Sequence, residues 1–467
     1  MCIRDSPDTM KKINYIPAII LFVALIDPTA CLGQFYGNKK FNRDSLLRVM
    51  DSLNKLSVAD HAQMTGQLGI HTVRPGRDPN SSDPDRQPNY DELKANPYCF
   101  YPDALTTFDG KKVKNAGMWR KTRRPELVKA FEEEIYGRIP DHVPAVHWKT
   151  VREEKTNLGG IPVVIRQLLG IVDNSDYPEI VVEIQAQIIW PENCLENMPV
   201  VLEFSWMMTD PRHPFGEGKP WQQLVVERGW AAAQIVPTSV QADGGYGLRE
   251  GIIGLCNKGQ YRKPCDWGSL RAWGWGASRM IDYLQADDRF DATKVAVEGV
   301  SRYGKAALVA MAFDERIAAG FICSSGKGGA AGWRRDCGES LGNLASDGEY
   351  HWMAGNFIKY GADPLNEDDL PVDQHELIAL CAPRPCFISA GSFEADKWVD
   401  IAGMFIAASK ASPVYELLGR KGLGTDILPV QGFGLLDGEL AYRQHHGGHE
   451  AGPNWPYFLD FFSRYID

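Results

Sequence analysis

Short apolar runs recur through the chain and are separated by longer segments with helical patterns. They cover residues 199–204, 231–236, 295–297, 317–323, 385–390 and 425–430. Continuous apolar runs that alternate with helices are typical of parallel strands buried on both faces. The pattern therefore predicts one α/β domain, a three-layer αβα sandwich with a mostly parallel sheet.

Other segments predict further strands and helices. Residues 161–172 form one candidate strand, and residues 180–190 alternate apolar and polar side chains, which is typical of a half-buried antiparallel strand. Helices are predicted over 125–137, which begins with Pro and ends with Gly, and over 268–285, with Asp266 as a possible cap. A last helix begins after Asn454, which can cap it.

The N-terminal part of the chain differs in composition from the rest. A basic pair precedes an apolar stretch over residues 13–26 and then small residues, so residues 1–33 predict a secretory signal peptide, with residues 1–9 as a non-native extension. The stretch is too short for a transmembrane span. Acylation of Cys31 as a lipoprotein is an alternative, disfavoured by Pro28. We expect a secreted or periplasmic protein.

Residues 34–95 are polar, and the stretch from Pro75 to Pro88 is rich in Pro, Asp, Asn, Ser and Arg. This composition predicts an irregular N-terminal arm or linker rather than core. The folded domain is expected to span residues 96–467.

Composition and charge narrow the choice of partners. The chain has 467 residues, 44% of them hydrophobic, and a net charge of -10, which argues against nucleic acid or an anionic membrane as a partner. No Cys-x-x-Cys pair occurs among the ten cysteines, so a structural zinc site is not expected. Cys256 and Cys265 are the best candidates for a local disulfide in an oxidising compartment.

Candidate chemistry begins at Ser301, which lies between the apolar run 295–297 and a predicted helix over 305–313. Gly299 and Gly304 flank the turn. A serine held between strand and helix by small residues is typical of a nucleophile elbow, where the helix N-terminus offers N–H groups to an oxyanion. The usual pattern is Gly-x-Ser-x-Gly, but here Tyr303 takes the place of the second glycine.

An acid and then a histidine that acts as general base should follow the serine, in that order, in an α/β-hydrolase. His449 follows two glycines just before the last helix, and both Glu394 and Asp396 follow the run 385–390. The residue pattern leaves these two carboxylates as alternatives. His445, His446 and His449 could instead bind a metal, although no carboxylate or cysteine cluster stands at ligand spacing.

A family resemblance rests on several ordered motifs. Gly299-Val-Ser-Arg-Tyr-Gly-Lys305 resembles the Gly-x-Ser-Arg-x-Gly-Lys signature of the glucuronoyl esterases, carbohydrate esterase family 15, where the late glycine is a family feature. Similar stretches include Trp119–Pro125, Arg271–Gly276 and Gly447–His449, and the resemblance runs from about Pro102 to the C-terminus. The resemblance implies a glucuronoyl esterase of the bacterial type, with an α/β-hydrolase fold.

The resemblance also implies roles for individual residues. Ser301 would be the nucleophile, His449 the general base, and Arg302 would stabilise the oxyanion. The side chains expected to bind the sugar are Lys305, Glu339 and Trp398.

The position of the catalytic acid in this sequence differs from its position in part of the family. Many members carry a Glu after the strand that follows the nucleophile helix, but residues 323–327 hold no carboxylate. Other bacterial members place an acid two residues before the binding tryptophan, which implies Asp396, with Glu394 in reserve. The fungal disulfide beside the nucleophile cannot form, because that position is Val300.

The expected function is that of a monomeric serine esterase without metal or organic cofactor. It would hydrolyse esters of (4-O-methyl-)glucuronic acid, as in the links between glucuronoxylan and lignin in plant cell wall. The alternatives are another carbohydrate esterase, such as an acetyl xylan esterase, and a non-catalytic sugar-binding descendant.

Overall fold

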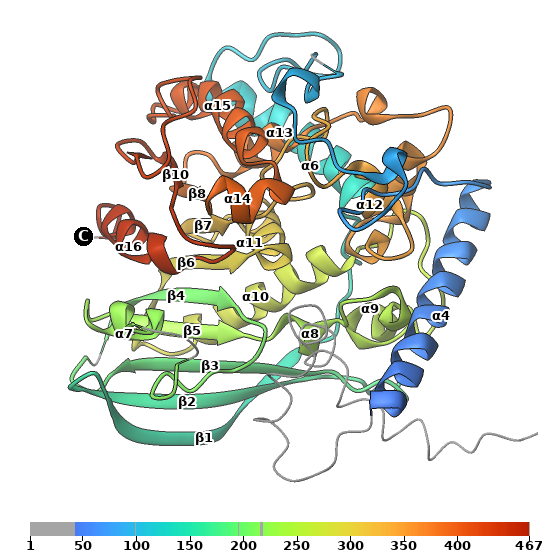
Figure 1. Cartoon of the computed structure of the whole chain (residues 1–467). Helices are drawn as coiled ribbons and strands as arrows, with labels where there is room; N and C mark the ends of the chain where they lie inside the picture. The colour runs from blue at the N-terminus through green and yellow to red at the C-terminus, as the bar shows by residue number, and fades with distance from the viewer. Residues whose placement is uncertain (1–42, 99, 195, 215–217, 467) are drawn as a thin grey trace, which may run out of the picture.

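A ten-stranded sheet runs through the molecule in the order β1-β2-β3-β5-β4-β6-β7-β8-β10-β9 (Figure 1). The computed structural model describes residues 43–98, 100–194, 196–214 and 218–466. The strands are β1 (Val146–Leu158), β2 (Ile161–Val172), β3 (Glu183–Pro191), β4 (Met198–Phe204), β5 (Ala231–Ile235), β6 (Phe290–Val300), β7 (Ala319–Cys323), β8 (Cys386–Ala390), β9 (Gly434–Leu435) and β10 (Leu440–Gln444).

The sheet is parallel from β5 through β4, β6, β7 and β8 to β10. At one edge β1, β2 and β3 are antiparallel, and β3 also pairs antiparallel with β5. The antiparallel prediction for residues 180–190 is therefore confirmed. Its half-buried character holds only at the start of β3, because every residue from Ala186 onward is buried.

The helices are α4 (Arg43–Leu68), α5 (Ala116–Met118), α6 (Arg124–Ala130), α7 (Trp221–Val226), α8 (Pro237–Val240), α9 (Gly251–Cys256), α10 (Ser269–Gln285), α11 (Arg302–Phe313), α12 (Leu341–Ala345), α13 (Gln374–Cys381), α14 (Phe393–Asp396), α15 (Ile401–Leu417) and α16 (Trp455–Ser463). A π-helical turn flanks α6 on each side, over Trp119–Arg123 and Phe131–Ile135, so the helix predicted over 125–137 is confirmed and begins earlier.

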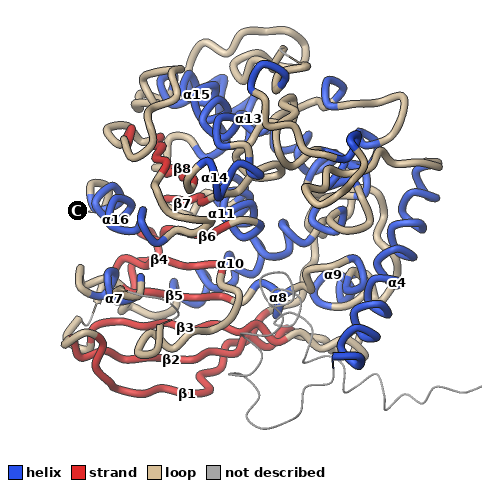
Figure 2. The backbone as a smooth tube through the Cα atoms, in the orientation of Figure 1, coloured by secondary structure: helices blue, strands red, loops and turns tan. Residues whose placement is uncertain are grey.

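Helices cover both faces of the sheet. In Figure 2, α7 and α16 lie on one side of the strands, and α10 and α11 lie on the other. Successive residues along a strand point to opposite faces of the sheet. Val201 and Ala296 pack with Phe458 of α16 on one face, whereas Leu202 and Val297 pack in the larger core with α10 and α11 on the other. The predicted three-layer α/β sandwich is confirmed.

The N-terminal arm is not irregular throughout, and that prediction is wrong for α4. This helix lies along the side of the molecule next to α9 (Figure 1). Its inward face buries Met64 but is otherwise polar: Ser57 accepts a hydrogen bond from the backbone of Tyr246 (3.0 Å), and Asp60 accepts one from Tyr350 Oη (2.6 Å). Because hydrogen bonds dock the helix, its sequence lacks the apolar period that predicts an amphipathic helix.

Several smaller predictions are wrong. Residues 425–430 are a surface loop rather than a strand, with Ile427 75% and Val430 78% exposed, so the last parallel strand is β10. Asp266 does not cap α10, whose N-cap is Gly268; the Asp266 carboxylate accepts from the backbone of Lys263.

Two further local predictions also fail. Asn454 stands at the N-cap of α16, but its side chain bonds to Arg443 instead of to the helix. Cys256 and Cys265 are free thiols. The predicted signal peptide and Cys31 lie outside the described residues. Within the described ranges, no helix has the length and apolar character needed to cross a membrane.

Candidate active site

Ser301 lies between the end of β6 and the start of α11, with φ 63° and ψ −130°. A positive φ is costly for a residue with a side chain, so the surroundings must hold this conformation. Gly299 permits the turn, because a Cβ there would lie 2.2 Å from the backbone oxygen of Tyr303. The Ser301 N–H donates to the carbonyl of Cys323 (3.0 Å). These features match the geometry of a nucleophile elbow.

The displaced second glycine has a packing reason. A Cβ at Gly304 would lie 2.6 Å from the carbonyl oxygen of Cys323, so the helix can approach β7 only with glycine there. Position 303, by contrast, faces the core, where the Tyr303 ring packs on Trp206 with centroids 4.4 Å apart. The glycine at position 304 therefore stands where the first turn of α11 approaches the backbone of β7.

Asp396 and His449 are in direct contact. Nδ1 of His449 and Oδ1 of Asp396 lie 2.5 Å apart. The other carboxylate oxygen accepts from the Gly391 N–H (2.6 Å) and from Ser324 Oγ (2.5 Å). Burial would raise the pKa of Asp396, but these hydrogen bonds outweigh it and lower the pKa. Glu394, on the same short helix α14, is exposed to solvent.

The loop that carries His449 is fastened to the rest of the site. The Gly447 carbonyl accepts from the N–H of Ser392 (2.9 Å), and the Glu450 carbonyl accepts from the thiol of Cys323 (3.2 Å). Because β6, β7, β8 and β10 are parallel, their carboxyl ends bring Ser301, Ser324, Asp396 and the histidine loop to one edge of the sheet. The structure thus brings the predicted nucleophile, acid and base to one edge.

The three histidines do not converge on a metal position. His445 Nε2 contacts the Glu450 carbonyl (2.9 Å), and His446 Nδ1 contacts the side-chain amide of Gln431 (3.0 Å). His449 contacts Asp396 instead. Among the described residues, no group of potential metal ligands includes any of these histidines.

Arg302, the first residue of α11, is fixed by Asp243. Its Nη1 donates to Asp243 Oδ2 (2.7 Å), and its guanidinium carbon lies 5.2 Å from the ring centroid of Trp352. Asp243 Oδ1 also contacts His351 Nε2 (2.9 Å) and the Trp352 indole N–H (2.8 Å). Burial alone would raise the pKa of Asp243, but the charge of Arg302 holds it far below its usual range. The arginine is therefore a fixed, charged group beside Ser301.

Lys305, Glu339 and Trp398 form a connected cluster. Lys305 Nζ donates to Glu339 Oε2 (2.8 Å) and to the carbonyl of Lys327 (2.6 Å), with both charged side chains of the pair buried. The Glu339 N–H donates to the Trp398 carbonyl (2.8 Å). Trp398 itself is half-buried. The three residues predicted to bind a sugar thus come together from α11, the loop 332–340 and the turn before α15.

Three further residues belong to this site and were not predicted from the sequence. Ser324 directly follows β7, and the rule that side chains at the carboxyl ends of parallel strands gather at one edge could have found it. Asp243 comes after β5 and the short helix α8, so the same rule indicates it less directly. Glu349 lies beyond α12 and has no comparable local signal. Burial and the nearby Glu339 raise the pKa of Glu349 to about 7, although Lys305 and Arg302 oppose this.

The parallel sheet, the elbow at Ser301 and the paired Asp396 and His449 define an α/β-hydrolase. Comparisons with known proteins narrow the class. The model of the protein family described as "Glucuronyl esterase, fungi" matches residues 258–419. Carbohydrate esterase MZ0003, from an unknown prokaryotic organism, is 31% identical over 411 residues, which cover 81% of this chain and 92% of that protein.

Two more similar proteins are also named as esterases that act on glucuronoyl groups. The solved structure of a CE15 glucuronoyl esterase from Teredinibacter turnerae T7901 is 44% identical, with a TM-score of 0.81, and the match covers 87% of this chain and 99% of that one. A 4-O-methyl-glucuronoyl methylesterase from Hypocrea jecorina is 38% identical over 161 residues, 32% of this chain and 34% of that protein. The chain belongs to the glucuronoyl esterases of carbohydrate esterase family 15.

Proposed function

We propose that this protein is a serine esterase that hydrolyses esters of glucuronic or 4-O-methyl-glucuronic acid. The observation that carries the proposal is the pairing of Asp396 with His449 over 2.5 Å at the sheet edge that also holds the strained Ser301. The fixed cation Arg302 stands next to the nucleophile, and the Lys305–Glu339 pair extends from the same helix. Cleavage of esters that join glucuronoxylan to lignin in plant cell wall would use this chemistry.

The reaction follows from the roles of the side chains. Ser301 Oγ attacks the ester carbonyl of the uronate while His449 takes its proton, and the ionised Asp396 orients the imidazole and stabilises the imidazolium. The N-terminus of α11 and the Arg302 guanidinium stabilise the negative charge on the carbonyl oxygen. His449 then protonates the leaving alcohol, and a water molecule activated by the same histidine releases the acid from Ser301.

Recognition of the sugar falls to the polar cluster beside the elbow. The Lys305 ammonium, the Glu339 carboxylate and the Trp398 ring supply a cation, an acceptor and an apolar face, which are the groups that sugar hydroxyls and a pyranose ring require. Glu349 would contribute a carboxyl group whose proton is held up to near pH 7. An acetyl group would need none of these side chains.

Side-by-side hydrolysis of benzyl glucuronate and acetylated xylan tests the proposal. We expect turnover of the glucuronate ester and its loss in Ser301→Ala. Activity on acetyl groups alone would point to an acetyl xylan esterase. Binding of xylan fragments without any cleavage would point to a sugar-binding descendant.

We also propose that the protein is exported through its N-terminal signal and acts as a monomer without a cofactor. Expression in a bacterial host, followed by sequencing of the mature N-terminus, tests the export signal. Size-exclusion chromatography with light scattering measures the mass of the mature protein, and a dimer mass would contradict the monomer.

A further inference from the structure

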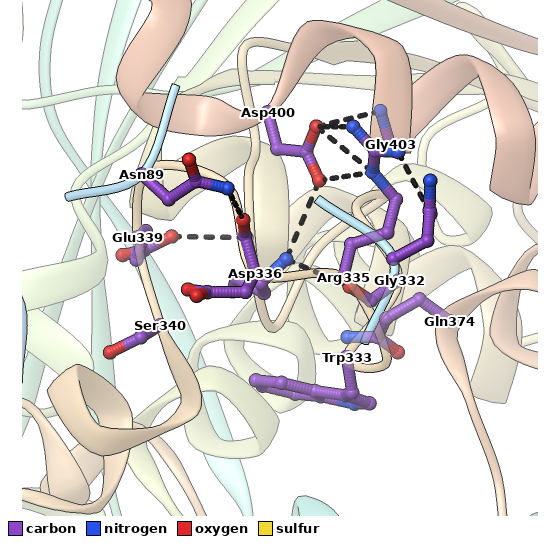
Figure 3. Close-up of polar contacts among 12 residues, drawn as sticks. Asn89, Gly332, Trp333, Arg335, Asp336, Glu339, Ser340, Gln374, Asp400 and Gly403 are labelled. Atoms are coloured by element: carbon purple, nitrogen blue, oxygen red, sulfur yellow. Dashed lines mark hydrogen bonds and ion pairs between the residues drawn. The ribbon is translucent and has the colours of Figure 1, made fainter. Parts of the chain in front are cut away.

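Arg335, four residues before Glu339, is buried with an exposed fraction of 2%. Its Nε donates to Asp400 Oδ2 (2.9 Å) and its Nη2 to Asp400 Oδ1 (3.0 Å), while Nη1 donates to Asn96 Oδ1 (3.0 Å). Figure 3 shows the guanidinium facing the Asp400 carboxylate. A planar fork on a carboxylate fixes orientation as well as distance. The loop that carries Glu339 is thereby anchored to Asp400.

Asp400 holds the turn that carries Trp398. It lies two residues after the tryptophan in a left-handed conformation, φ 54° and ψ 71°, and caps α15 by accepting from the Gly403 N–H (2.9 Å). A non-glycine residue needs support to remain in this conformation. Burial would raise the pKa of Asp400, but Lys327 and Arg335 outweigh it and lower the pKa, so the carboxylate stays charged.

An N-terminal segment, residues 76–96, completes the arrangement and is called the brace below. Both oxygens of Glu92 lie 3.0 Å from Nη2 of the buried arginine. The Asn89 carbonyl accepts from the Gly338 N–H (2.9 Å), and the Asn89 side chain donates to the Asp336 carbonyl (2.6 Å, Figure 3). The brace therefore supplies main-chain partners to the same loop that ends at the sugar cluster.

The network reaches the sugar cluster through two links. The Glu339 N–H donates to the Trp398 carbonyl (2.8 Å), so the loop and the turn share a main-chain bond. The Lys327 N–H donates to Glu339 Oε2 (3.0 Å), and Lys327 Nζ lies 3.5 Å from Asp400 Oδ2. Movement of Arg335 or Asp400 would therefore displace both predicted sugar contacts together.

The same place offers a possible metal site, which the charges disfavour. Ligand atoms of Glu92, Cys337 and Asp400 lie within 4.8 Å of one another. Arg335 already contacts both carboxylates, and burial, helped by Asp400, raises the pKa of the Cys337 thiol to about 12. A protonated thiol is a poor ligand, and the positive charge beside it repels a cation. The cluster is held by arginine instead.

We infer that Arg335, held by Glu92 and Asp400, is a positioning residue for Glu339 and Trp398, so that the brace is part of the substrate site. The inference rests on the proposed function, since it assigns a role to residues around its sugar cluster. None of the network's hydrogen bonds involves Ser301 or His449. Loosening it should therefore weaken sugar binding and leave the chemical step intact, which raises KM without lowering kcat.

Glu92→Gln is the decisive variant. The Glu92 side chain is 56% exposed, and removal of its charge leaves the buried Arg335–Asp400 pair in place. We expect KM for benzyl glucuronate to rise about tenfold, as expected for a misplaced substrate contact, with kcat unchanged. Hydrolysis of 4-nitrophenyl acetate, which has no sugar, should not change. Arg335→Lys, which keeps the charge and loses the fork, should raise KM at least as much.

Asp363→Asn is the matched control. Asp363 pairs with Arg74 (3.1 Å), just before the brace, and its side chain is 92% exposed. It should leave KM and kcat as in the wild type. An unchanged KM in Glu92→Gln overturns the inference, and so does an equal loss on both substrates, which would indicate general loosening of the fold.

Direct binding separates this inference from the proposed function. Calorimetry with glucuronic acid should show weaker binding to Glu92→Gln than to the wild type, and equal binding contradicts the inference. If the wild type cleaves 4-nitrophenyl acetate but no glucuronate ester, the proposed function fails instead, and the binding comparison still decides the role of the brace.

Discussion

His449 Nδ1 lies 2.5 Å from Asp396 Oδ1, although 53 residues separate them in the chain. The contact gives the acid a single imidazole partner, and the hydrogen bonds from Gly391 and Ser324 occupy the second oxygen. A carboxylate so fully engaged can hold one tautomer of the ring, leaving the other ring nitrogen for the serine.

Replacement of the acid should remove most of the activity. Asp396→Asn keeps the shape but loses the charge and the tautomer control, so we expect kcat to fall by about 10⁴-fold. Glu394→Gln is the matched control from the same short helix α14, and its exposed side chain predicts near wild-type rates. Steady-state kinetics on benzyl glucuronate measures both, and a reversed ranking would exchange the roles of the two carboxylates.

Replacement of the nucleophile should separate binding from turnover. Ser301→Ala removes the attacking oxygen and leaves the Lys305–Glu339 pair in place. We expect no measurable ester turnover and an unchanged affinity for glucuronic acid, measured by calorimetry. Residual turnover close to the wild-type rate would place the nucleophile elsewhere.

Asp243 should act through Arg302. In Asp243→Asn the amide oxygen can still accept from His351 and Trp352, but its NH₂ group would face Nη1 of the arginine in place of a carboxylate. Misplacement of one oxyanion donor predicts a loss of about 10²-fold in kcat. Thermal unfolding of the variant is the control, since a fall in kcat that only follows unfolding would assign Asp243 a merely structural role.

Glu349 should make product inhibition depend on pH. Its pKa is raised to about 7, so below that pH the group is neutral and above it the group is negative. The product is a carboxylate, which a negative Glu349 repels, so inhibition by glucuronic acid should weaken as pH rises through 7. Glu349→Gln should remove this pH dependence. An identical pH dependence in the variant contradicts the assignment.

The late glycine of the elbow should be irreplaceable. Gly304→Ala would bring a Cβ within 2.6 Å of the Cys323 carbonyl and 2.9 Å of the Gly299 carbonyl, both rigid backbone atoms. Overpacking of this kind costs about 1–3 kcal/mol of unfolding free energy and should also shift Ser301. Gly66→Ala on α4 is the control, because no atom lies within 4 Å of its Cβ position. Denaturant unfolding and esterase rates test both variants.

Local sequence patterns predict much of the fold. The apolar runs at β4, β5, β6, β7 and β8 predict their strands because each buried strand is a continuous stretch of chain. The run at 425–430 looks the same in sequence, yet Ile427 and Val430 lie on the surface. Apolar composition alone does not reveal whether a neighbouring strand is available for pairing.

The sequence did not predict helix α4 mainly because this helix docks on the rest of the protein through polar groups. The helix α4 attaches through Ser57, Asp60 and His61, whose partners lie far away in the chain, for instance Ala345 for His61 (2.9 Å). Hydrophobic periodicity cannot detect such a helix, because hydrogen-bond partners are chosen by tertiary contact. The brace on the loop 335–339 was missed for the same reason.

Patterns between near neighbours in the sequence predicted the strands from β2 to β8, the elbow glycines and the succession of Ser301, Asp396 and His449. These depend on steric limits and apolar periods between near neighbours, which any single sequence displays. Only the tertiary structure put Asp396 and not Glu394 against His449, and Asp243 against Arg302. Such pairings join loops from separate strands, and only the folded sheet, with its parallel strands side by side, brings those loops to one edge.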